Sequence, residues 1–164
     1  WAAESWSQRD DPVALRAAFG DFGREARAML DAVDAVNLWG LFRHPVARTW
    51  HANRLAILGD AAHPTLPFLA QGASMALEDA WVLADALSSE ATVPAALARY
   101  QARREGRTAR VVAAASRNAW KYHLSFPPFR WAAHTALRAG GRIAPVRMMR
   151  QFDWLYGHDV TQAA

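Results

Sequence analysis

The sequence predicts an α/β fold that is mostly helical. Five or six segments carry helical spacing or helix-start signals, whereas only one or two short segments have strand character. The clearest strand candidate is the wholly apolar run 55–58, which ends at Gly59 and is typical of a strand buried on both faces. A lone buried strand leaves its backbone groups unpaired, so we expect it to join a sheet built from other sequence.

The first 53 residues predict two short helices followed by a weak strand. Asp11 before Pro12 is typical of an N-cap and of proline at the first helical position, so a helix should run to about residue 19. Asp21 is expected to start a second helix, and residues 36–42 favour a strand. Residues 50–53 are expected to form a turn. The apolar face of the second helix would comprise Phe22, Ala26, Met29, Leu30 and Val33.

The remaining sequence predicts four further helices. The first spans residues 72–87, and the second runs from Pro94 to about Tyr122. The third follows the break at 127–128 and closes at the glycine pair 140–141, and the fourth runs from Pro145 to about residue 156. The helix at 72–87 has an apolar stripe at helical spacing, which comprises Ala73, Ala76, Leu77, Ala80, Ala84 and Leu87.

Composition limits the class of protein. A length of 164 residues fits one domain, and 52% hydrophobic residues are enough for a packed core. The sequence contains no cysteine, which excludes disulfides, thiolate catalysis and cysteine-ligated metals. Lys121 is the only lysine among the 19 basic residues, so the net charge of +4 reflects either a coding bias toward arginine or attraction for an anionic partner such as a dinucleotide.

Three features that the sequence lacks bear on the cellular compartment and the processing of the protein. No apolar run approaches the roughly 20 residues that cross a bilayer, and no signal peptide is visible. These features are compatible with a cytoplasmic protein that does not act at a membrane. The chain begins with Trp1 instead of methionine, which suggests a processed or truncated piece.

Residues 54–81 form the most informative stretch of the sequence. They combine the apolar run, a Gly–Asp turn, a proline-rich loop and a helix that opens on Gly72. A carboxylate at the end of a strand, here Asp60, can hold a sugar or polyol hydroxyl, and the N–H groups at a helix start can hold negative charge. Together they predict a cofactor site. The alternative is an ordinary turn or cap aspartate, because Gly–Asp is a common turn pair.

These residues also carry a family resemblance. GDAAHPTLPFLAQGASMALEDAWVLADAL, at 59–87, resembles the second flavin-binding motif of single-component FAD-dependent aromatic monooxygenases of the para-hydroxybenzoate hydroxylase type. NLWGLFRHPVARTWH at 37–51, the helix at 94–110 and DWLYGHD at 153–159 are similar to the salicylate and 3-hydroxybenzoate hydroxylase branch. The resemblance implies the C-terminal portion of a para-hydroxybenzoate hydroxylase-like FAD-binding fold.

The resemblance also implies a division of the chain and a reaction. Residues 1–52 would end the substrate-binding domain, 53–122 would form the C-terminal part of the FAD-binding domain, and 123–164 would form a helical region. The implied activity is hydroxylation of a small aromatic compound, with FAD as cofactor and with NAD(P)H and O2 as co-substrates.

The cofactor-binding residues are likewise implied by the resemblance. Gly59 and Asp60 form the turn, where the Asp60 carboxylate would bond the ribityl chain of FAD. The carbonyl of Pro67 would lie beside the flavin ring. Backbone N–H groups at the helix start would face the pyrimidine end and stabilise negative charge on reduced flavin. These residues are Gln71, Gly72, Ala73 and Ser74.

The N-terminal part of such an enzyme is not found in this sequence. The family's GxGxxG fingerprint and its middle motif are both absent. We therefore expect the chain to need an N-terminal portion, as a separate or missing segment, and to be inactive alone. It would be a fragment, a truncated gene product or one half of a two-chain assembly.

Other residues have structural explanations at least as good as functional ones, and no catalytic residue is assigned. His63 is expected to support the turn, because the six histidines lack metal-ligand spacing and no metal site is predicted. Glu78 and Asp79 are adjacent on a helix and point in different directions, so we expect them to support nearby loops. An aromatic substrate pocket or ordinary core would explain Trp39, Phe42, His44 and Phe68.

Two alternatives to the enzyme remain open at this stage. The chain could be a non-catalytic helical interaction module derived from such an enzyme. Less support exists for a basic helical nucleic-acid-binding domain, because stacking or base-contacting residues are scarce and a solvated face is the commoner explanation of such a charge run. The arginines concerned are Arg99, Arg103, Arg104, Arg107 and Arg110.

Overall fold

The computed structural model describes residue 5 and residues 7–162, which form two compact units, Trp1–Phe42 and Arg43–Ala164. Each unit is considered by itself. The chain therefore divides after Phe42, whereas the three-part division at residues 52 and 122 stays a prediction. Trp1, on which the expectation of a processed chain depends, lies outside the described residues.

Over its described residues, the first unit contains two helices and one small antiparallel strand pair. Strand β1 (Arg9–Asp10) pairs with β2 (Val36–Asn37), and helices α1 (Pro12–Ala18) and α2 (Arg24–Asp31) lie between them in the sequence. The predicted N-cap is confirmed, because the Asp11 carboxylate accepts the N–H of Val13 at 2.8 Å.

Two expectations for this unit need correction. The second helix begins at Arg24 and not at Asp21, because a turn forms first: the Phe22 N–H bonds the carbonyl of Phe19, and the two rings pack edge to face. The expected strand over 36–42 shrinks to Val36–Asn37. Its β1 partner is itself only two residues long, and beyond the pair the Leu38 N–H bonds the carbonyl of Gln8 at 2.9 Å.

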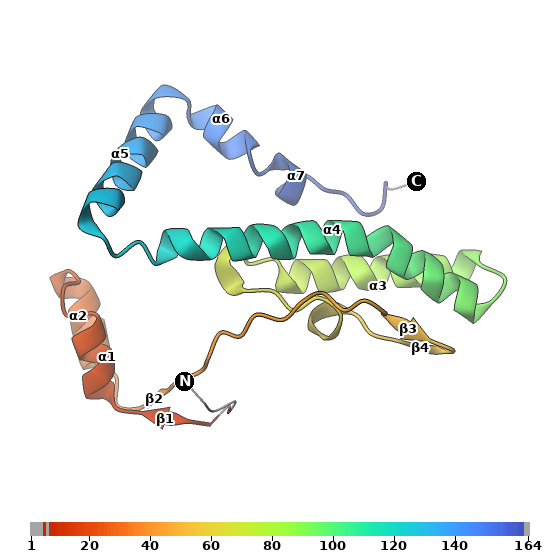
Figure 1. Ribbon diagram of the computed structural model, residues 1–164, viewed down its shortest axis with the longest axis horizontal. Coiled ribbons are helices and arrows are strands. Elements are labelled where there is room, and N and C mark those ends of the chain that lie inside the picture. The colour runs from red at the N-terminus through yellow and green to blue at the C-terminus, as the bar shows by residue number, and fades with distance from the viewer. Residues whose placement is uncertain (1–4, 6, 163–164) are drawn as a thin grey trace. The chain divides into compact units, whose positions relative to one another are not determined.

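The second unit starts with a small hairpin and continues into helices (Figure 1). Its elements are β3 (His51–Ala52), β4 (Leu55–Ala56), the short 3-10 helices η1 (Gly59–Ala61) and η2 (Pro67–Leu69), α3 (Gly72–Ser89), α4 (Val93–Tyr122), α5 (Pro127–Ile143), α6 (Pro145–Arg150) and α7 (Asp153–Tyr156).

The hairpin corrects two predictions. Residues 51 and 52 belong to β3, so the expected turn at 50–53 is displaced toward Asn53, which adopts a left-handed φ of 53°. The run 55–58 is not buried, since Leu55 is 77% exposed and Leu58 is 38% exposed. The only strand that β4 pairs with in the described residues is β3.

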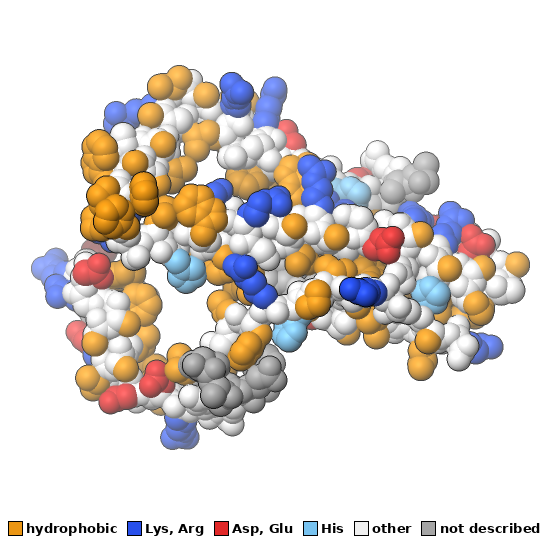
Figure 2. Space-filling model, in the orientation of Figure 1, with side chains coloured by type: hydrophobic (Ala, Val, Ile, Leu, Met, Phe, Trp, Pro, Cys, Tyr) orange, Lys and Arg blue, Asp and Glu red, His pale blue; other side chains and the backbone are white. Residues whose placement is uncertain are grey.

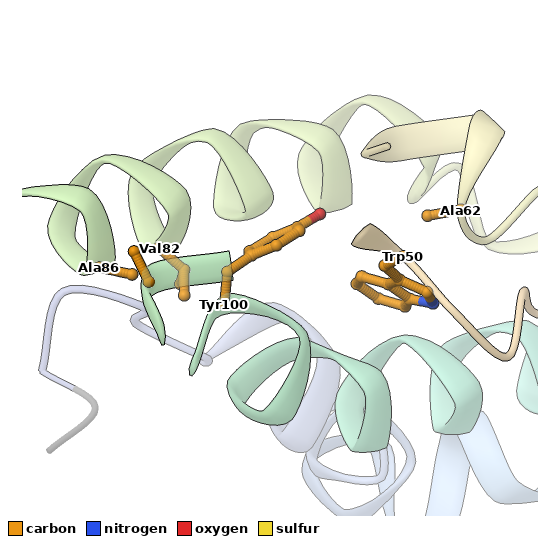
Figure 3. Close-up of a cluster of buried hydrophobic side chains, with 6 residues drawn as sticks. Trp50, Ala62, Val82, Ala86 and Tyr100 are labelled. Carbon is orange, nitrogen blue, oxygen red and sulfur yellow. The ribbon is translucent and has the colours of Figure 1, made fainter. Parts of the chain in front are cut away.

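Helices α3 and α4 pack side by side and enclose the main core (Figure 1). The first buried cluster lies along the helix pair, and Figure 3 shows Val82, Ala86 and Tyr100 near one another with Trp50 beside Tyr100. It comprises Trp50, Ala62, Val82, Ala86, Ala96 and Tyr100. A second buried cluster comprises Leu69, Met75, Val111, Ala115 and Leu155, so the C-terminal α7 also packs on this helix pair.

The predicted apolar stripe of α3 is on the wrong face. Its members Leu77 and Leu87 are 74% and 47% exposed. The buried face comprises Met75, Asp79, Val82 and Ala86. Both sets have helical spacing, and the buried one includes an aspartate, so hydrophobic periodicity could not distinguish them.

Helix α5 continues through Gly140 and Gly141 to Ile143, contrary to the expected end at the glycines. A Cβ on Gly140 would lie 2.7 Å from the Met148 sulfur, so this glycine allows α6 to approach closely. The expected last helix is interrupted between Arg150 and Asp153, giving α6 and α7. Apolar side chains, including those of Phe129 and Trp131, remain exposed on α5 (Figure 2).

Candidate functional site

The Gly–Asp turn lies against the start of α3. Gly59 has a φ of +58°, a left-handed conformation that favours glycine, and it begins the short helix η1. Asp60 follows it and is exposed. A Cβ built on Gly72 would lie 3.7 Å from Oδ1 of Asp60, so this carboxylate is next to the first residue of α3. The structure thus brings together two predicted site elements that are twelve residues apart in the sequence.

The first turn of α3 presents backbone donors. An α-helix cannot satisfy its first N–H groups internally, and no side chain caps this helix. The first internal bond is that from the Met75 N–H to the carbonyl of Gln71, at 2.9 Å. Within the part of the chain that the structure describes, the N–H groups of Gly72, Ala73 and Ser74 have no recorded acceptor. They are suited to an anion or a carbonyl oxygen.

The loop before α3 is held by its own backbone. The Pro67 carbonyl accepts the N–H of Ala70 at 3.1 Å, and Ala70 has a left-handed φ of 52°. Because a carbonyl has two lone pairs, that of Pro67 keeps one for another donor. The Gln71 side chain is buried and its Nε2 lies 3.4 Å from the carbonyl oxygen of Leu69, so Gln71 contributes to the loop through both side chain and backbone.

Asp79 connects the turn to the helix pair. Its carboxylate is fully buried and accepts three donors: the Gly59 N–H at 2.9 Å, Nε2 of His63 at 2.6 Å and Nε of Arg104 at 2.7 Å. His63 is also fully buried, which agrees with its expected structural role. Three donors satisfy a buried carboxylate that would otherwise be strongly disfavoured.

The arginines of α4 extend this network, which corrects the expectation of a solvated face. Arg104 is 1% exposed and its Nη1 lies 2.6 Å from Glu78 Oε2. Arg107 binds the same Glu78 through Nε at 2.7 Å and Nη2 at 2.8 Å, and it donates to the carbonyls of Trp154 and Leu155 in α7. Arg99 is more exposed and pairs with Glu90.

Sequence reasoning missed Arg104 and Arg107 as partners of the carboxylates. A signal was present, because Glu78 and Asp79 interrupt an alanine-rich helix that must pack closely on a neighbour. Buried carboxylates require cations, and the next helix supplies them at positions three residues apart.

The network lowers the pKa of both carboxylates. Burial alone would raise the pKa of Asp79, but the hydrogen bonds from His63, the Gly59 N–H and Arg104 outweigh it. Burial would also raise the pKa of Glu78, and the hydrogen bonds and positive charges of Arg107 and Arg104 reverse that effect. Both groups therefore remain ionised at neutral pH.

We expect acid to destabilise the fold through these two groups. Because their pKa values are lower in the folded chain than their ordinary values of 3.8 and 4.5, the stability they contribute is present above those values and is lost as the pH falls through the folded-state pKa. Urea unfolding should show a free energy of unfolding that declines below about pH 4.5. The Glu78→Gln variant should decline less steeply, and an equal slope would contradict this origin.

The proposed aromatic pocket is not assembled within either unit. Trp39 and Phe42 are 56% and 43% exposed in the first unit, so ordinary core is the wrong explanation for them in this chain. In the second unit, His44 is exposed, and Phe68 stacks on Tyr122 with ring centroids 5.3 Å apart. A substrate-binding role for these residues stays a prediction.

Other kinds of site find little support in the described residues. No group of three or more His, Asp or Glu side chains among them is arranged to hold a metal ion. None of the described helices combines the length and the apolar character needed to cross a membrane.

The Gly–Asp turn and the start of α3 lie within a segment that matches a known cofactor-binding family. Residues 9–115 match the family described as FAD binding domain. The match covers more than half of the chain, and the chain belongs to this family.

The curated relatives are aromatic hydroxylases. A 3-amino-4-hydroxybenzoate 2-monooxygenase, PtnB3 from Streptomyces platensis, is 32% identical over 97% of this chain and 39% of its own length. The salicylate hydroxylase of Pseudomonas putida is 30% identical over 98% of this chain and 36% of its own length. The resemblance to this branch is confirmed, and the chain spans less than two-fifths of these relatives.

The solved structures include one of the same fold. A variant of HpxO from Klebsiella pneumoniae, in complex with FAD, matches with a TM-score of 0.64 and 25% identity. The match covers 85% of this chain and 39% of that one. The predicted fold, a mostly helical part of an FAD-binding α/β protein, is therefore confirmed.

Proposed function

We propose that this chain is the C-terminal part of an FAD-dependent monooxygenase that hydroxylates a small aromatic compound with NAD(P)H and O2. The observation that carries the proposal is the Asp60 carboxylate next to Gly72 at the start of α3, where no acceptor among the described residues takes the N–H groups of the first turn. The aromatic substrates named for the relatives support the substrate class.

The residues present fit FAD. Asp60 would accept hydroxyl groups of the ribityl chain, and the N–H groups of Gly72, Ala73 and Ser74 would bond the pyrimidine end of the ring. Gly72 has no Cβ, so the cofactor can approach the helix start closely. The bound flavin would supply hydride acceptance and oxygen activation, whereas the protein binds, orients and excludes water. The carbonyl of Pro67 would lie beside the ring.

The N-terminal portion of the enzyme would complete the site. The chain spans 39% of its matched relative PtnB3, and no GxGxxG pattern occurs in its sequence. An N-terminal portion would therefore supply the remaining FAD contacts and most substrate contacts. We propose that the assembled enzyme works in the cytoplasm and that the chain alone does not oxidise NAD(P)H.

Asp60→Ala should weaken FAD binding by the assembled protein. Loss of a hydrogen bond that involves a charged group costs about 1.5–3 kcal/mol, which corresponds to a rise of roughly 10- to 100-fold in the dissociation constant. FAD titration followed by flavin absorbance and fluorescence measures this change. Asp21→Ala is the control, since Asp21 is an exposed aspartate of the first unit. The dissociation constant of FAD for this variant should equal that of the wild-type protein.

An absorbance spectrum and intact masses of the purified protein distinguish the monooxygenase from the two alternative functions. A flavin absorbance spectrum together with intact masses that include an N-terminal portion supports the monooxygenase. A colourless protein that folds without flavin, even when the N-terminal portion is present, would favour a helical interaction module. The nucleic-acid alternative has lost support, because Arg103, Arg104 and Arg107 pair with carboxylates of α3.

A further inference from the structure

Asp79 is attached to the turn that carries Asp60, although it does not belong to the predicted cofactor-binding set. We propose that Asp79 is a positioning residue, which sets the place of the Asp60 carboxylate and thereby the affinity for FAD. The proposal rests on the proposed function, because it assumes that Asp60 contacts the cofactor.

Asp79 contacts the turn at the backbone N–H of the residue before Asp60. Asp79 Oδ2 accepts the N–H of Gly59, the residue that precedes Asp60. Gly59 has a φ of +58°, and a Cβ there would lie 3.2 Å from the Cβ of Ala76. The turn is therefore packed closely on α3 in a conformation that few other residues adopt. Loss of the Asp79 bond leaves that turn without its anchor on the helix.

Two further residues hold the Asp79 carboxylate in place. His63 Nε2 shares Oδ2 with Gly59, and Arg104 Nε binds Oδ1, so both carboxylate oxygens are occupied. Arg104 also donates to the carbonyl of Met75 at 3.3 Å and pairs with Glu78. With these contacts the carboxylate cannot rotate without breaking a buried hydrogen bond, and the Gly59 acceptor stays in place.

The loss of the negative charge of Asp79 would by itself strengthen FAD binding, whereas loss of its positioning role would weaken it. FAD is an anion, so removal of a negative charge from the protein should strengthen its binding by long-range electrostatics. An Asp79→Asn variant that binds FAD more weakly would therefore report altered geometry. Asp85→Asn is the matched control, because Asp85 lies on the same helix and pairs with Arg103 of α4, but has no recorded contact with the turn.

The test measures the FAD dissociation constant of the assembled protein for Asp79→Asn, Asp60→Ala and the double variant. We expect Asp79→Asn to raise the constant about tenfold, which is 1.4 kcal/mol, and Asp85→Asn to leave it unchanged. In the Asp60→Ala background, Asp79→Asn should change it less than twofold, because its effect acts through Asp60. Circular dichroism and a thermal midpoint well above the assay temperature establish that each variant is folded.

The outcomes separate this inference from the function on which it rests. Independent, multiplicative effects of the two substitutions, or an unchanged constant for Asp79→Asn, would overturn the positioning role. Wild-type protein that binds no FAD would instead overturn the proposed function. If Asp79→Asn does not fold, Gly59→Ala tests the same turn position, and its effect should also disappear in the Asp60→Ala background.

Discussion

Arg104→Met should lower the free energy of unfolding by about 3–5 kcal/mol, the range found when one partner is removed from a buried ion pair. Arg104 is 1% exposed and binds Asp79 at 2.7 Å and Glu78 at 2.6 Å. Methionine fills a similar volume but leaves Asp79 with two donors and no arginine. Glu78 keeps Arg107, so the loss comes mainly from Asp79.

Urea unfolding followed by circular dichroism measures this loss. The control is Arg99→Met on the same helix, where the side chains of Arg99 and its partner Glu90 are 43% and 30% exposed. Because solvent screens that pair, the control should lose much less stability than Arg104→Met. Equal losses for the two variants would show that burial of the network contributes nothing beyond an ordinary surface pair.

Trp50→Ala should produce a loss of similar size, about 3–5 kcal/mol, by opening a cavity in the first core cluster. Trp50 is 1% exposed and lies with Tyr100, Val82 and Ala86 between the helices (Figure 3). Its ring centroid is 5.6 Å from that of Tyr100, and its indole N–H donates to the carbonyl of Ala47 at 2.8 Å. The substitution removes both the packing and this hydrogen bond.

The matched control is Trp131→Ala on α5, where the side chain is 72% exposed. It should change the unfolding free energy of the chain by no more than about 0.5 kcal/mol. Trp50→Phe should be intermediate, because it keeps part of the ring packing and loses the N–H donor. A Trp50→Ala loss as small as that of Trp131→Ala would mean that the Trp50 cluster is not the core.

Some helix limits were predictable from neighbouring residues. The Asp11–Pro12 start of α1, the Gly72 start of α3 and the span of α4 to Tyr122 agree with the structure. The two starts depend on a cap, a proline or a glycine within one turn, whereas the glycine pair 140–141 did not end α5 as expected. The second helix was placed too early because the Phe19–Phe22 contact forms a turn that propensity does not indicate.

The sequence indicated the turn and the helix start of the candidate site, but it did not indicate the residues that hold them. The Gly–Asp pair and the glycine at the helix start are local features, and the structure places the Asp60 carboxylate next to the start of α3. Their roles toward FAD stay predictions that the Asp60 experiment tests. The support from Arg104 could not be derived, because the partners Asp79 and Arg104 are 25 residues apart on different helices.

The sequence by itself determined the order of the helices, the Gly59–Asp60 turn and the resemblance that led to the family. Only the tertiary structure decided which face of α3 is buried and which arginines are paired. The physical reason is that helical spacing fits two faces of α3 equally well. Gly59, His63 and Arg104 offset the cost of burying Asp79, so the face that carries Met75, Val82 and Ala86 can pack inward.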